Sequence, residues 1–287
     1  MIKVAYQELG ELILLELRHF CIDRDVLDCV DEVCQVGLNL KKSVRLDDPG
    51  KIAMVGYTPG SRSSPSIMRS KDLRKPTTLF DSPANLREFD FNCSSVFALM
   101  WNMMQRQLPT EVLDDLKDFS TKCNMAMDVA RVMDSYYGIQ DGIGVYYEFH
   151  NTELAPPQGN FAKNYARFCH NESNATKYCF AWTTSRQNAI HEGGEFFIAD
   201  YAIKVQPSAD TLVVVWRGKD YHGTTLPHCD PQQLNTDFHQ VGLSITISGR
   251  VKKLFKEMEE QKLDKRDEIE KAFEEAMVVA GASDFDE

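Results

Sequence analysis

Three residues in the second half of the chain have the chemistry of a metal site. His170 and Glu172 are separated by a single residue in the stretch FCHNESNATKY, and His222 follows later in the chain. Side chains at positions i and i+2 of a strand point to the same face, so this pair can reach one ion. Two imidazoles and one carboxylate form the facial triad of non-haem Fe(II) sites, which leaves coordination positions open. We therefore interpret His170, Glu172 and His222 as candidate iron ligands.

The same stretch also allows a different interpretation. Residues 171–173 and 174–176 are overlapping N-x-S/T acceptors for glycosylation, which would require a secreted protein. The first residues, MIKVAYQELGELILLELRHF, have neither the basic start nor the uninterrupted apolar core of a signal peptide. The sequence therefore predicts a cytoplasmic or nuclear protein that is not secreted. The remaining alternative is structural, with His170 and Glu172 at a polar loop end and His222 capping a turn before Gly223.

The composition is that of a globular protein with a large core. A hydrophobic fraction of 43% in 287 residues is too high for a disordered chain. The net charge of −11 counts against an extended nucleic-acid surface. The eight cysteines contain no C-x-x-C pair, which indicates reduced and mostly buried thiols.

The pattern of apolar residues divides the chain into three regions. Residues 3–38 are predicted to be helical, residues 41–90 to be loops with at most short strands, and helices are predicted from Ser94, over 110–123, and up to a stop at Gly138. After Gly138, short runs rich in Val, Ile, Phe and Tyr alternate with turn residues, as in an all-β sandwich or barrel. The chain ends with a charged amphipathic helix and an acidic tail.

These regions give the predicted fold class and domain organisation. We expect an α+β protein with a jelly-roll core and flanking N-terminal and C-terminal helices. The predicted boundaries are 1–138 for a helical and loop-rich region, 139–252 for the β core, and 253–287 for the C-terminal helix and tail.

Other histidines in the core offer a competing set of ligands. His191, Glu192 and Glu195 lie close together, although Gly193 and Gly194 between them favour a tight turn into the next strand. His228 is expected to face solvent or to support the site, and His19 and His150 are expected to be structural.

Four segments of the core resemble the Fe(II)/2-oxoglutarate-dependent oxygenases with a double-stranded β-helix, and most of all the TET/JBP-like branch of fungi and protists. The segments are HNESNATKYCFAWTT, HEGGEFFIADYAIKV, DTLVVVWRGKDYHGTT and FHQVGLSITISGRV. The resemblance implies that His170, Glu172 and His222 bind Fe(II), with Glu172 where Asp is usual. It also implies O₂ and 2-oxoglutarate as co-substrates.

The family's cation for the 2-oxoglutarate carboxylate is missing from its usual place. The window PHCDPQQLNTDFHQV after His222 contains no Arg or Lys. An Arg suits this role because its fork binds a carboxylate through two hydrogen bonds. Arg250 and Arg167 are the candidates that we assign to it, ahead of Arg186, Lys204 and Arg217. A different reductant in place of 2-oxoglutarate is the alternative.

The sequence thus predicts an oxidoreductase, a non-haem iron dioxygenase that oxidises a C–H bond of a small molecule such as an amino acid or secondary metabolite. A TET/JBP-like oxygenase of modified nucleic-acid bases and a non-catalytic jelly-roll binding protein are the alternatives. The basic loop 59–76 is a candidate lid. Four aromatic residues could line the pocket, although residues at this strand spacing more often belong to plain core: Trp182, Phe196, Tyr201 and Trp216.

Overall fold

The computed structural model describes most of the chain. The described residues are 2–8, 10–21, 23–60, 65–70, 82–123, 125–127, 137–140, 146–150, 152–187, 193–227 and 238–260.

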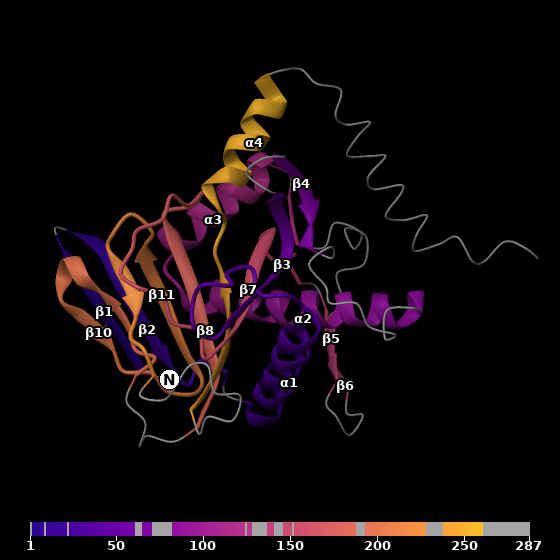
Figure 1. Cartoon of the computed structure of the whole chain (residues 1–287), viewed down its shortest axis with the longest axis horizontal. Coiled ribbons are helices and arrows are strands. Elements are labelled where there is room, and N and C mark those ends of the chain that lie inside the picture. Colours follow the sequence, from indigo (N-terminus) through magenta and orange to yellow (C-terminus); the bar gives the residue numbers. More distant parts are fainter. Residues whose placement is uncertain are drawn as a thin grey trace, which may run out of the picture.

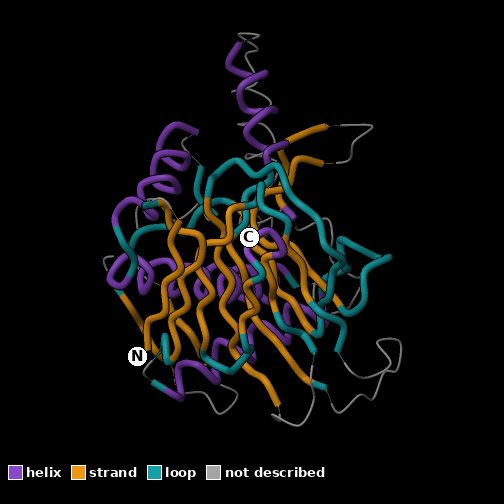
Figure 2. The backbone as a smooth tube through the Cα atoms, turned by 90° about the vertical axis from the view of Figure 1, so that its left-hand side faces the viewer, coloured by secondary structure: helices purple, strands orange, loops and turns teal. Residues whose placement is uncertain are grey.

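An eight-stranded antiparallel sheet is the centre of the described structure (Figure 2). Its strand order is β1-β2-β11-β8-β13-β7-β3-β4, so strands from the second half of the chain form its centre and strands from the first half lie at both edges. The bounds are β1 Ile2–Glu8, β2 Glu11–Arg18, β3 Lys51–Gly60, β4 Pro65–Arg69, β7 Gln158–Lys163, β8 Tyr178–Gln187, β11 Thr211–Arg217 and β13 His239–Ile245.

A smaller sheet packs against one face of this large sheet. It has the order β10-β9-β12, with β9 Phe196–Ile198, β10 Ile203–Val205 and β12 His222–Thr224. Ile198 and Val205 from the small sheet pack with Leu14, Cys179 and Val213 from the large sheet, all of them buried. Two short strands, β5 Tyr137–Gln140 and β6 Tyr146–Phe149, form a separate hairpin.

Helices cover the opposite face of the large sheet (Figure 1). Helix α1 begins after Asp23, whose carboxylate accepts hydrogen bonds from the backbone N–H groups of Asp25 and Val26. Its buried residues recur with helical spacing and join the main core, as do residues of α2 and α3. The bounds are α1 Arg24–Leu40, α2 Pro83–Gln107, α3 Thr110–Cys123 and α4 Gly249–Glu260.

The mixed helix-and-sheet class is confirmed, but the helix predicted over the first residues is wrong. The segment ELILLELR is β2, which pairs with β1 on one side and β11 on the other, and Gly10 has a φ of +81° at the hairpin turn. Six consecutive residues of β2 are buried because elements cover both of its faces. A continuous apolar run of this kind cannot be distinguished from a buried helix by periodicity.

Three further predictions for the N-terminal region need correction. The ten-residue strand β3 lies where only loops or short strands were predicted. Helix α2 begins at Pro83, upstream of the predicted Ser94, because Pro is well suited to the first turn. Gly138 lies in β5 and does not end a helix, while residues 128–136 of that predicted helix lie outside the described residues. The boundaries 1–138, 139–252 and 253–287 stay a prediction.

The predictions for the cysteines and for the second half of the chain agree with the structure. Short strands follow Gly138, and α4 occupies the start of the predicted C-terminal helix, whose residues 261–287 lie outside the described residues. The seven described cysteines are free thiols, and all of them except Cys169 are buried. None of the described helices is long and apolar enough to cross a membrane.

The contact between α1 and β7 leaves no room for a side chain at Gly37. A Cβ atom there would lie 2.5 Å from the ring of Phe161, which is fully buried and stacks on Phe97 with 5.3 Å between ring centroids. We expect Gly37→Ala to lower the free energy of unfolding by about 1–3 kcal/mol because overpacking outweighs the gain in helix propensity. Urea denaturation measures this change. Val36→Ala, at an exposed position of the same helix, should change it by less than about 0.5 kcal/mol.

Candidate metal centre

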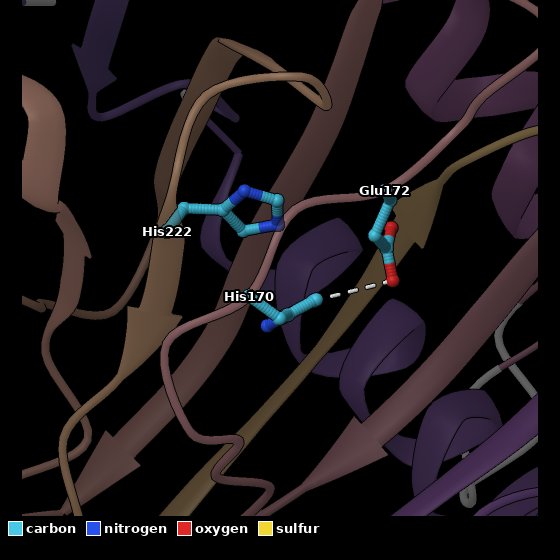
Figure 3. A group of neighbouring side chains, drawn as sticks. All are labelled: His170, Glu172 and His222. Carbon is cyan, nitrogen blue, oxygen red and sulfur yellow. Dashed lines mark hydrogen bonds and ion pairs between the residues drawn. The ribbon is translucent and has the colours of Figure 1, made fainter.

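The three predicted ligands lie together in the structure. One ligand atom from each of His170, Glu172 and His222 falls within 4.8 Å of the others, and the ring centroids of the two histidines are 4.5 Å apart. Figure 3 shows the three side chains converging on a common space. His222 is far from His170 and Glu172 in the sequence, so the fold brings it to the other two residues.

Backbone pairing places the ligands. His170 and His222 form an antiparallel bridge in which each N–H donates to the other's carbonyl at 2.8 Å. The N–H of Glu172 donates to the carbonyl of Gly218 at 2.6 Å. The segment that carries His170 and Glu172 therefore runs alongside β12, and its extended backbone presents both side chains toward His222.

Hydrogen bonds orient both imidazoles for metal binding. The Nδ1 atom of His170 is 2.8 Å from the carbonyl of Phe168, and that of His222 is 2.8 Å from the carbonyl of Asp220. A carbonyl only accepts, so Nδ1 must carry a proton in each ring, and in the neutral ring Nε2 then has the lone pair. This is the tautomer and support that metal-bound histidines use.

The contact between His170 and Glu172 is favourable only with a positively charged group between the two side chains. Nε2 of His170 lies 3.3 Å from Oε1 of Glu172. With the Nδ1 atom already protonated, two acceptor atoms face each other unless a proton or a metal ion lies between them. The donor set of two imidazole nitrogens and one carboxylate fits non-haem Fe(II).

Charges around Glu172 keep its carboxylate ionised. Burial raises the pKa of Glu172, but the hydrogen bond from His170 and the positive groups nearby outweigh it, so the pKa is lowered overall. Arg45 and Arg167 approach the same oxygen, Oε1, at 3.6 and 3.8 Å. Burial lowers the pKa of His222, which favours the neutral ring that a metal ion needs.

The three ligands open into a cavity of about 1050 Å³ between the two sheets. Residues of β3, β7, β8 and β13 form its floor, and Phe196 lies beside the candidate ligands with its ring 5.8 Å from that of His222. Its volume is in the range of cavities that bind small molecules.

The two arginines predicted to bind a carboxylate both line this cavity. Arg167 is largely buried, and its Nε atom has no hydrogen-bond partner within the described part of the chain. Arg250 donates to the carbonyl of Gly60 at 3.2 Å. Arg186 instead contacts Gln240 and the carbonyl of Gly193, and it is not among the lining residues.

Several other residues that the sequence named as candidates can also be located in the structure. Glu195 accepts a hydrogen bond from Thr225 and pairs with Lys204 at 3.6 Å. Trp182 lines the cavity, as predicted, and it also belongs to the main core, where its indole donates to Asp210 at 3.2 Å. The side chains of His191, Glu192, Trp216 and His228 lie outside the described residues, as does much of the predicted lid.

The sequence did not single out Arg45 or the role of Asp220. Arg45 lies in the loop between α1 and β3, where no motif marks it. The main-chain carbonyl of Asp220 accepts the hydrogen bond from Nδ1 of His222. The side-chain carboxylate of Asp220 accepts a hydrogen bond from Nε of Arg217 at 2.8 Å. The i, i+3 spacing of Arg217 and Asp220 is the feature of the sequence from which their ion pair could have been predicted.

Comparisons with known proteins support the fold. Neither the models of protein families nor the curated proteins give a match. Among solved structures, NgTET1 in complex with 5mC DNA matches with a TM-score of 0.51 and 13% identity, covering 86% of this chain and 77% of that chain. This chain shares the fold of NgTET1 over most of its length.

Two other solved structures match more weakly. OsALKBH1 has a TM-score of 0.40 and 11% identity, covering 85% of this chain and 98% of that chain. A prolyl-4-hydroxylase from Pseudomonas putida has a TM-score of 0.37 and 10% identity, covering 81% of this chain and 91% of that chain. The match to NgTET1 alone confirms the predicted TET-like resemblance, as a likeness of fold.

Arg217 supports the metal centre from outside. Besides Asp220, its guanidinium pairs with Glu11 of β2 at 2.5 Å and donates to the hydroxyl of Tyr201. We expect Arg217→Met to weaken Mn(II) binding about tenfold or more, because the turn that presents the Asp220 carbonyl to His222 loses its anchor.

Equilibrium dialysis of the folded protein measures this affinity. Lys219→Met, at an exposed position of the same turn, is the matched control and should bind normally. Unchanged affinity in Arg217→Met would show that the turn holds His222 without it.

Proposed function

We propose that the protein is a non-haem Fe(II)-dependent oxygenase that uses 2-oxoglutarate and O₂ to oxidise a C–H bond of a small molecule. The observation that carries the proposal is the contact of His170 Nε2 with Glu172 Oε1 at 3.3 Å beside His222, with both Nδ1 protons already assigned to carbonyls. In this proposal the large sheet and the β10-β9-β12 sheet form a double-stranded β-helix around the cavity.

The residues at the centre would have distinct tasks. His170, Glu172 and His222 would hold the iron, which would couple O₂ and the decarboxylation of 2-oxoglutarate to substrate oxidation. Glu172 would contribute the single negative charge among the ligands. Phe196 and the surrounding strands would keep bulk water away from the reacting atoms.

Arg167 is the side chain that we assign to a carboxylate of 2-oxoglutarate. It lies 3.8 Å from Glu172, is largely buried, and its Nε atom has no partner among the described residues. A buried guanidinium donor without a partner is costly, and a bound carboxylate would remove that cost. Arg250 remains the second candidate for this role.

The metal ligands give the first test of the proposal. We expect His170→Ala and His222→Ala to lose Fe(II)-dependent formation of succinate from 2-oxoglutarate, because each removes one of three ligands. His239→Ala is the matched control, since its ring contacts Ser185 at 3.1 Å and takes no part in the triad. Succinate formation that persists in both ligand variants would contradict the proposal.

The co-substrate arginine gives a second test. We expect Arg167→Met to raise the KM for 2-oxoglutarate by roughly 10- to 100-fold, because a charge-assisted hydrogen bond of about 1.5–3 kcal/mol is lost. Steady-state kinetics with Arg250→Met alongside compares the two candidates. A rise confined to Arg250→Met would transfer the role to that residue.

A second candidate function is the oxidation of modified bases in nucleic acid. The likeness to NgTET1 in complex with 5mC DNA favours it, whereas the net charge of −11 counts against it. Binding of a methylated duplex at two salt concentrations distinguishes the two functions.

A further inference from the structure

The cavity carries far more positive charge than the rest of the chain would suggest. Arg45, Arg69, Arg167 and Arg250 line it, whereas Glu172 is its single acidic residue among those the structure describes. The whole chain, by contrast, has a net charge of −11. A cavity whose charge opposes that of the protein concentrates anions from solution.

Arg45 is poorly explained as a stabilising residue. Its side chain is 42% exposed, and its guanidinium nitrogen lies 3.6 Å from Oε1 of Glu172. An exposed ion pair at this distance contributes between 0 and about 1 kcal/mol. Arg167 approaches the same oxygen at 3.8 Å, so one carboxylate oxygen faces two guanidinium groups.

The loop that carries Arg45 is held in place by hydrogen bonds. The N–H of Val44 donates to the carbonyl of Ile52 on β3 at 2.9 Å. The hydroxyl of Tyr165 donates to the carboxylate of Asp48 at 2.5 Å. Arg45 is therefore presented to the cavity by a fixed backbone, which lowers the entropy cost of binding a ligand there.

The proposed co-substrate leaves positive charge unbalanced. This step rests on the proposed function, in which a metal dication, the Glu172 carboxylate and the 2-oxoglutarate dianion occupy the centre. Together these three bring a charge of about −1 to a cavity lined by four arginines. Arg167 is the arginine assigned to 2-oxoglutarate, and an anionic substrate would balance part of the positive charge of the other three arginines.

The residue next to Arg45 indicates the other part of the ligand. Leu46 also lines the cavity, yet 86% of its surface is exposed. Because Leu46 is adjacent to Arg45 and both line the cavity, a ligand bound to Arg45 can also cover the side chain of Leu46. The two neighbours thus offer one charged and one apolar contact.

We propose that the substrate is a small organic acid, that its carboxylate or phosphate group binds Arg45, and that its apolar part covers Leu46. Arg45 is then a specificity-determining residue for this oxygenase. The volume of about 1050 Å³ accommodates such a molecule beside the co-substrate.

Simple anions can test the site without knowledge of the full substrate. The full-length protein is loaded with Mn(II) and saturated with 2-oxoglutarate, and inorganic phosphate or ¹³C-acetate is added as the probe. Since Arg45 contacts the metal ligand Glu172, an anion bound to Arg45 lies close enough to Mn(II) for fast paramagnetic relaxation of its ³¹P or ¹³C nucleus. We expect fast relaxation of at least one probe, and the faster one identifies the acid group.

Variants in the loop before β3 test whether the anion binds at Arg45. Arg45→Gln should reduce the relaxation of the bound probe at least fivefold and leave the Kd of 2-oxoglutarate unchanged. Arg45→Lys should retain part of the effect because it keeps the charge. Lys42→Gln removes a charge from the same loop at an exposed position that does not line the cavity, and it should behave as the unmodified protein.

Several outcomes would overturn the inference. Slow relaxation of both probes would show that no anion binds, and equal relaxation in Arg45→Gln would show adventitious binding elsewhere. A Kd for 2-oxoglutarate raised tenfold in Arg45→Gln would assign Arg45 to the co-substrate. Displacement of the probe by a methylated duplex would assign it to nucleic acid. Mn(II) binding that survives in His170→Ala would instead refute the proposed function.

Discussion

The pair of backbone hydrogen bonds between His170 and His222 is the contact on which the centre depends. It joins two segments that are remote in sequence, and it fixes their relative register. A shift of one residue would turn the side chain of each ligand to the opposite face. The carbonyls of Phe168 and Asp220, which orient the two rings, lie on the same two segments. The same backbone pairing therefore fixes both the position and the tautomer of the two histidine rings.

The large sheet gives these segments a rigid support. Helices cover one of its faces and the small sheet packs on the other, so the strands below the cavity are buried from both sides. Arginines reach the cavity from different elements: Arg45 from the loop before β3, Arg167 from the segment after β7, and Arg250 from the start of α4. The strands thus fix the metal ligands, and the connections between them determine the charge around those ligands.

The sequence predicted the centre better than the elements at the edge of the sheet. His170 and Glu172 could be found because the i, i+2 spacing is a local signal, and the strands after Gly138 are rich in β-branched and aromatic residues. The segment ELILLELR could not be assigned, since its partner β11 is remote and its burial on both faces removes any periodicity. Arg45 was missed because its approach to Glu172 depends on tertiary packing alone.

The ion-pair network at Arg217 connects the metal centre to the edge of the sheet. Glu11 belongs to β2 and is half exposed, whereas Asp220 is buried beside His222. Edge hairpins fray more readily than central strands, and fraying of β1 and β2 would release Glu11 first. Arg217 would still keep Asp220 and Tyr201. Loss of the contact with Glu11 would therefore leave the turn before His222 still held by Arg217.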